Sequence, residues 1–88
     1  MRDKMHFVYI LKSLKDGGFY IGCTTNLDKR LSIHNSGKTE SLKKRRPLEI
    51  IYFERYDDQK RAYDRERQIK RYKGGEAFKK LIQLGEVA

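Results

Sequence analysis

Two short runs of β-branched and aromatic residues open the chain. Residues 7–11 (FVYIL) and 19–23 (FYIGC) flank residues 16–18 (DGG), which favour a tight turn, so the pattern predicts a β-hairpin. A third run, residues 48–55 (LEIIYFER), carries apolar residues on both faces. This pattern is typical of a strand in the interior of a sheet.

Helical signals lie between and after these strands. Thr25, with Asp28 three residues later, resembles a capping box, and residues 35–37 (NSG) provide a stop signal. We therefore expect a first helix at about residues 26–35.

Two more helices are expected near the C-terminus. Asp57 and Asp58 can cap a second helix that runs through Lys73, before the glycine pair at 74–75. Apolar residues at helical spacing then predict a short third helix at about residues 76–84.

The segment between the first helix and the third strand has a different composition. Residues 37–47 (GKTESLKKRRP) carry five positive charges against one negative and end in proline, so we expect a loop. The element order is then β-β-α-β-α-α. It predicts an α+β fold with a small, three-stranded, mainly antiparallel sheet flanked by helices.

Length and composition limit the possibilities further. A chain of 88 residues fits a single domain, residues 1–88. A lone cysteine, with no signal peptide and no apolar run long enough to cross a bilayer, predicts a cytoplasmic protein without a membrane association. The formal charge of +9 favours a polyanionic partner, most often nucleic acid.

Charged side chains occupy unexpected positions on two of the predicted helices. At 100° per residue, Arg30 and His34 fall on the same side as Leu27 and Leu31. On the second helix, Glu66 lies on the side that also carries Ala62, Tyr63, Ile69 and Lys70. A carboxylate turned towards a core is costly unless it is paired, hydrogen-bonded or bound to metal, so these positions are candidates for a functional site.

With these residues in view, the chain resembles the GIY-YIG nucleases, especially the small stand-alone bacterial proteins of that superfamily. Residues 8–10 (VYI) stand at the first motif and residues 20–22 (YIG) match the second. Arg30, His34 and Glu66 follow at the family's spacing. The resemblance covers about residues 7–71. Val8 and Cys23 occupy places where family members carry a glycine and, in some cases, a lysine.

The resemblance implies a metal-dependent endonuclease that hydrolyses DNA phosphodiester bonds. Glu66 would hold Mg²⁺ or Mn²⁺, and Arg30 would contact non-bridging phosphate oxygens. Tyr20 would receive the proton of the attacking water and Tyr9 would orient that water. His34 is an alternative base or a proton relay, and the sequence does not choose between tyrosine and histidine.

Binding residues are expected on the basic segment and on the outer face of the second helix, where they would contact backbone phosphates without reading bases. The candidates are Lys38, Lys43, Lys44, Arg45, Arg46, Arg61, Arg67, Lys70 and Arg71.

Other interpretations of the same residues stay open at this point. Glu66 can simply pair with Lys70 one turn later, and the basic segment can be an ordinary solvated surface. The main alternative function is a nucleic-acid-binding module, for RNA or branched DNA, with little or no cleavage. A weaker one is a basic helix that meets an acidic membrane or protein. A larger protein partner could supply targeting to either.

Overall fold

The computed structural model describes residues 5–87 of the chain. Strands β1 (His6–Ser13) and β2 (Phe19–Thr24) form an antiparallel hairpin, followed by helix α1 (Leu27–Asn35), a short 3₁₀ helix η1 (Glu40–Arg45) and strand β3 (Leu48–Tyr56). Helices α2 (Gln59–Arg71) and α3 (Glu76–Val87) complete the fold. The predicted α+β class and antiparallel three-stranded sheet are confirmed.

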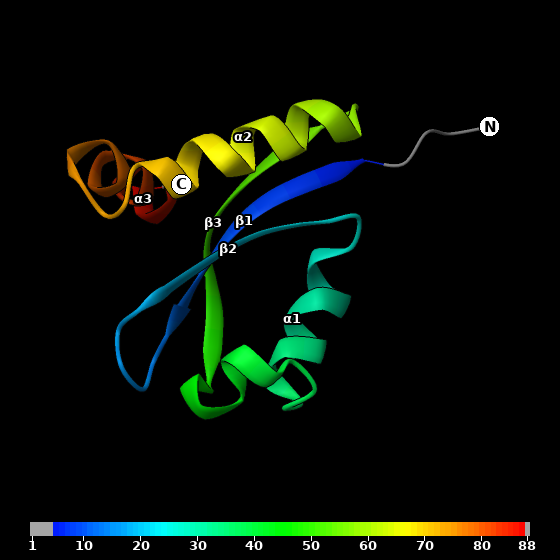
Figure 1. Ribbon diagram of the computed structural model, residues 1–88, viewed down its shortest axis with the longest axis vertical. Coiled ribbons are helices and arrows are strands. Elements are labelled where there is room, and N and C mark those ends of the chain that lie inside the picture. The colour runs from blue at the N-terminus through cyan, green and yellow to red at the C-terminus, as the bar shows by residue number, and fades with distance from the viewer. Residues whose placement is uncertain (1–4, 88) are drawn as a thin grey trace.

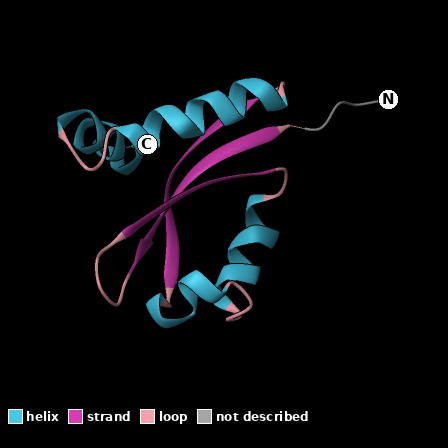
Figure 2. Cartoon of the chain, in the orientation of Figure 1, coloured by secondary structure: helices cyan, strands magenta, loops and turns pink. Residues whose placement is uncertain are grey.

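The sheet lies between two layers of helix. Figure 1 shows α2 and α3 on one face and α1 with η1 on the other, and the three strands between them are seen clearly in Figure 2. The α2-side core consists of buried apolar residues from the sheet, α2 and α3: Val8, Ile10, Ala62, Ile69, Phe78 and Leu81. The α1-side core consists of Tyr9, Leu11, Leu42 and Leu48, with Leu27 and Leu31 of α1 packed against them.

The strand order is β2-β1-β3, so the prediction that residues 48–55 form an interior strand is wrong. β3 is an edge strand, and the interior position belongs to β1, whose residues 8–11 are all buried. β3 carries apolar residues on both sides for a different reason, because Ile51 and Tyr52 pack on the α2-side core while Ile50 packs on the α1-side core. Pairing shifts from Ile10↔Tyr52 to Leu11↔Ile50, which leaves Ile51 as the extra residue of a β-bulge.

Two local expectations are also corrected. Helix α1 is capped by Asn26, whose side chain accepts a hydrogen bond from Lys29 N, and not by Thr25. The predicted loop at 37–47 contains η1, because Leu42 is 1% exposed and anchors this turn to the α1-side core. One apolar residue among many cations is a weak sequence signal, although its burial orders the segment.

Helix α2 begins where expected but ends at Arg71 rather than Lys73, and α3 runs to Val87 rather than to about residue 84. Its N-cap is Asp58, which accepts a hydrogen bond from Lys60 N, and the chain turns after Arg71 with positive φ at Lys73 and Gly74. No helix within residues 5–87 is long and apolar enough to cross a bilayer.

Candidate functional site

Tyr9 and Tyr20 lie side by side on the α1-facing side of the hairpin. Their ring centroids are 6.4 Å apart, and Tyr9 pairs across the strands with Gly22. A Cβ atom at Gly22 would lie 2.6 Å from the Tyr9 hydroxyl oxygen and 2.8 Å from the ring. The glycine of the Tyr-Ile-Gly sequence is therefore required because the Tyr9 ring lies directly over its backbone.

His34 joins this pair from α1. It is 2% exposed, its Nε2 lies 3.1 Å from the Tyr9 hydroxyl, and its ring meets the Tyr20 ring edge-on with centroids 5.4 Å apart. Its Nδ1 lies 2.8 Å from the hydroxyl of Thr39. A neutral imidazole satisfies both contacts with either tautomer, since both partners are hydroxyls that donate and accept.

Burial sets the protonation of these groups. Desolvation, with the nearby Arg30 charge, lowers the pKa of His34, which favours the neutral ring. Desolvation and the neighbouring Tyr20 raise the pKa of Tyr9 well above its usual range. Tyr9 is consequently a protonated phenol whose hydroxyl is held by His34.

Arg30 does not point into the core as its helical position predicted. Its side chain is exposed, although its charge still acts on Tyr9 and His34. A long guanidinium side chain can lay its stem over apolar residues and keep its head in water. Arg30 also lines a small open pocket of about 260 Å³ with Lys29 and Ile33, at the N-terminal end of α1. It lies at the rim of the tyrosine pair, where an anionic ligand can reach it.

Glu66 approaches the hairpin from α2. Its side chain is 18% exposed, and one carboxylate oxygen lies 2.8 Å from Lys70 Nζ. It faces Cys23, the residue after Gly22, where burial and the carboxylate together raise the pKa of the thiol to about 12. The pairing of Glu66 with Lys70, one of the sequence alternatives, is thus present, and the Lys70 pKa is raised by it.

The structure contains a second buried carboxylate that sequence analysis missed. Glu54 of β3 is held by both arms of the Arg65 guanidinium, at 2.9 Å each. The hydroxyls of Tyr52 and Tyr56 donate to the same carboxylate. A glutamate between two tyrosines, each two residues away on a strand, is the only hint that the sequence offers.

Metal ligands are sparse. Within residues 5–87 no group of three or more His, Cys, Asp and Glu side chains is arranged to hold an ion. Glu66 of α2 is a carboxylate whose charge acts on Tyr9, where it raises the pKa of the phenol.

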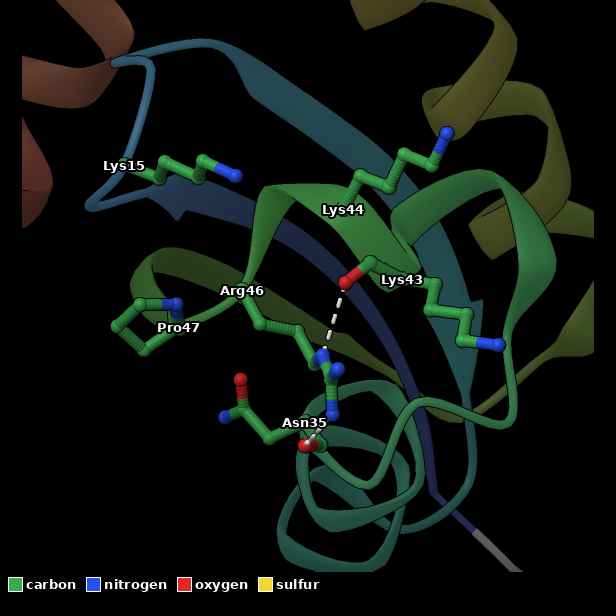
Figure 3. Close-up of a pocket in the computed structure, with 6 residues that line it drawn as sticks. All are labelled: Lys15, Asn35, Lys43, Lys44, Arg46 and Pro47. Carbon is green, nitrogen blue, oxygen red and sulfur yellow. Dashed lines mark hydrogen bonds between the residues drawn. The ribbon is translucent and has the colours of Figure 1, made fainter.

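The cations that were expected to bind phosphate lie in residues 37–47 and on α2. Lys43, Lys44 and Arg46 line an open pocket of about 550 Å³ together with Lys15, which the sequence did not single out. Arg46 lies across this pocket and donates from Nε to the Lys43 carbonyl at 2.8 Å. The Lys43 and Lys44 side chains extend away from the Arg46 guanidinium (Figure 3).

Ion pairs reduce the availability of three candidates, one of them Lys70 through its contact with Glu66. Arg45 is half-buried and pairs with Asp16 at 3.2 Å, and Arg67 pairs with Asp64 at 2.7 Å. The other expected binding residues all have exposed side chains: Lys38, Lys43, Lys44, Arg46, Arg61 and Arg71. Tyr63, expected on the inner side of α2, is 47% exposed.

Comparisons with known proteins agree on one family. The model of the GIY-YIG catalytic domain matches residues 5–79. A UPF0213 protein of Staphylococcus haemolyticus is 38% identical over 86% of this chain and 93% of its own length, and one of Staphylococcus epidermidis is 41% identical over 91% and 96%. The solution structure of a UPF0213 protein from Bacillus halodurans is 31% identical, covers 91% of this chain and 84% of that one, and has a TM-score of 0.57.

Proposed function

The chain belongs to the family of the GIY-YIG catalytic domain, and on this premise we propose that it is a divalent-metal-dependent endonuclease that hydrolyses DNA phosphodiester bonds. One observation carries the proposal. The Tyr9–His34 hydrogen bond and the adjacent Tyr20 ring lie on the α1-facing side of the hairpin at Gly22, and Glu66 meets the next residue, Cys23, from the α2 side, where its charge also acts on Tyr9.

Tyr20 is the group of this set that meets the attacking water. It is half-buried, and its hydroxyl has no hydrogen-bond partner among the described side chains, whereas both ring nitrogens of His34 are engaged. As a phenolate, Tyr20 would accept the proton of the water and become the neutral phenol. His34 and Thr39 act as positioning residues, because His34 holds the Tyr9 hydroxyl, which orients the water, and packs edge-on against the Tyr20 ring, while Thr39 holds the other ring nitrogen of His34.

Arg30 supplies the phosphate contact. Its exposed guanidinium can bind two non-bridging oxygens in a planar fork, a geometry that lysine does not offer. Its position one helical turn before His34 places this contact at the edge of the tyrosine pair.

The donors fit Mg²⁺ or Mn²⁺. Mg²⁺ commonly takes one or two protein carboxylates and completes its octahedral shell with water and substrate phosphate oxygens, so Glu66 alone is a sufficient protein ligand. When bound, the ion would neutralise charge on the phosphate and on the leaving oxygen.

A second candidate function has its own support. Lys70 lies 2.8 Å from the Glu66 carboxylate and competes with a cation for it, and Cys23 stands where some family members carry lysine. These features favour a nucleic-acid-binding module that cuts weakly or not at all.

The two functions separate in one assay. Purified protein is incubated with single-stranded, duplex and branched DNA and with RNA, in Mg²⁺, Mn²⁺ or EDTA, with Tyr20→Phe and Glu66→Ala in parallel. Metal-dependent cuts lost in both variants support the nuclease. Binding without cutting by the wild type in any metal supports the module instead.

A further inference from the structure

An exposed aromatic pair lies on the α1-facing side of the sheet. Phe53 of β3 is 53% exposed, and Phe7 of β1 is half-buried beside it, with ring centroids 6.0 Å apart and planes at 70°. Both residues share the face of Tyr9, because Phe53 pairs with Tyr9 across the strands and Phe7 is two residues before it. The α1-side core buries Tyr9 and Leu11 but leaves this end of the face open.

A cation flanks the pair. Arg55 is exposed, pairs with Phe7 across the strands and lies two residues after Phe53, so it is on the same face. The acidic neighbour in the sequence, Glu54, points to the opposite face, where Arg65 and two tyrosines hold it. This end of the face therefore offers two aromatic rings and a guanidinium.

We propose that Phe7, Phe53 and Arg55 form a stacking subsite for one unpaired nucleobase, so that the substrate is single-stranded or locally unpaired nucleic acid. This inference rests on the proposed function, from which it takes nucleic acid as the ligand. It adds that the bound nucleic acid is single-stranded or locally unpaired. Phe53 is directly opposite Tyr9 on the neighbouring strand, so a nucleotide on this pair belongs to the strand whose phosphate meets Tyr20 and Arg30.

The chemistry of the surface selects an unpaired base. A base has an open π-face for an aromatic ring or a guanidinium only when it is unstacked from its neighbours, and such contacts do not require sequence recognition. The protein's formal charge of +9 favours a polyanion on this face over a second, equally charged copy of the chain.

The test is binding in EDTA, measured by fluorescence anisotropy with three labelled probes that carry the same number of phosphates. The probes are a single strand, the same strand with abasic positions, and a hairpin duplex. Phe53→Ala is expected to weaken single-strand binding at least about 5-fold, to leave abasic and duplex binding unchanged, and to keep the salt slope. Phe53→Tyr should retain the wild-type affinity.

Leu14→Ala is the matched control, because Leu14 is also exposed, at 56%, but lies in the β1–β2 turn. It should change none of the three affinities, and thermal melting and size-exclusion chromatography confirm that each variant is folded and of wild-type size. Equal weakening on the abasic strand, no weakening on the intact strand, or a change of oligomeric state in Phe53→Ala would overturn the proposal.

The assay requires no cleavage, so the two proposals can fail separately. If the wild type binds bases through Phe53 but never cuts, the nuclease proposal is contradicted and the proposal of a stacking subsite stands. If the wild type cuts but binds intact and abasic strands with equal affinity, only the proposal of a stacking subsite is contradicted.

Discussion

Glu54 on β3 and Glu66 on α2 expose nearly equal shares of their side chains, 17% and 18%, but they meet different sets of donors. Glu54 accepts from both arms of Arg65 and from the hydroxyls of Tyr52 and Tyr56. Glu66 has one ion-pair partner, Lys70, whose own side chain is 54% exposed. Burial alone does not distinguish these carboxylates, whereas the number of donors does.

The surroundings of the two groups differ in the same way. Arg65 also reaches Gln68 at 3.0 Å and Tyr72 at 3.4 Å, so the Glu54 network fastens α2 to β3 and leaves few acceptor positions. Glu66 faces the hairpin beside Cys23, within the electrostatic reach of Tyr9. A carboxylate with unused acceptor capacity is the one that can hold a cation, which in turn binds phosphate oxygens, so we propose that the chemistry lies at Glu66 and assign stability to Glu54.

The largest expected effect separates the two residues by activity. Glu66→Gln should reduce metal-dependent cleavage by at least about 10³-fold, because the proposed protein ligand for the ion is lost, while the affinity for DNA in EDTA is retained. Glu54→Gln should cut within a few-fold of the wild-type rate when assayed below its melting temperature. Initial rates on an end-labelled strand measure both. Equal loss in the two variants would remove the distinction.

Stability should show the opposite ranking. Glu54→Gln is expected to lower the free energy of unfolding by about 1.5–3 kcal/mol, since charge-assisted hydrogen bonds in a mostly buried network are broken. Glu66→Gln should change it by less than about 0.5 kcal/mol, because one i,i+4 pair with an exposed lysine is lost. Urea denaturation followed by circular dichroism measures both. A larger loss in Glu66→Gln would contradict the assignment.

Low pH should reduce the stability that the Glu54 network contributes. Burial works against its charge, but hydrogen bonds from Arg65, Tyr52 and Tyr56 outweigh it and lower the pKa of Glu54 below 4.5. A folded-state pKa below the unfolded one contributes stability that is complete above about pH 5 and is lost as the pH falls through the folded pKa. The wild type should therefore lose more stability than Glu54→Gln between about pH 5 and pH 3. Melting curves across this range that stay parallel for the two proteins would refute the network's role.

The smallest effect concerns the partner of Glu66. Lys70→Met should lower the Mg²⁺ concentration needed for half-maximal cleavage by about 2- to 10-fold, because a competing cation is removed from the carboxylate at a cost of about 0.5 kcal/mol or less in stability. Lys60→Met is the matched control, since Lys60 pairs with Asp64 at the same i,i+4 spacing but is 83% exposed. A higher Mg²⁺ requirement in Lys70→Met would mean that Lys70 assists binding.

Local patterns predicted much of this structure. Strand alternation and turn residues gave the hairpin, helical spacing gave α2 and α3, and the placement of Glu66 on the inner side of its helix holds. These features depend on contacts within a few residues, which a sequence displays directly.

The remainder depended on contacts between distant segments. The edge position of β3 follows from which strand pairs with β1, and the consecutive residues Ile51 and Tyr52 pack on the same face because Ile51 is the extra residue of a β-bulge. Thr39 reaches His34 through the ordering of η1 around one buried leucine. Arg30 shares the helical side of His34, but its length takes the charge to solvent, which periodicity does not reveal.

The most direct test of the account is Mn²⁺ binding, followed by the loss of the free-ion signal in electron paramagnetic resonance, with a nuclease-resistant phosphorothioate single strand present. Wild type, Glu66→Gln and Glu54→Gln are compared at one temperature at which all three are folded. Wild type and Glu54→Gln should bind the ion, and Glu66→Gln should not. Binding by Glu66→Gln at the wild-type level, or its loss only in Glu54→Gln, would contradict the claim that the open carboxylate is the functional one.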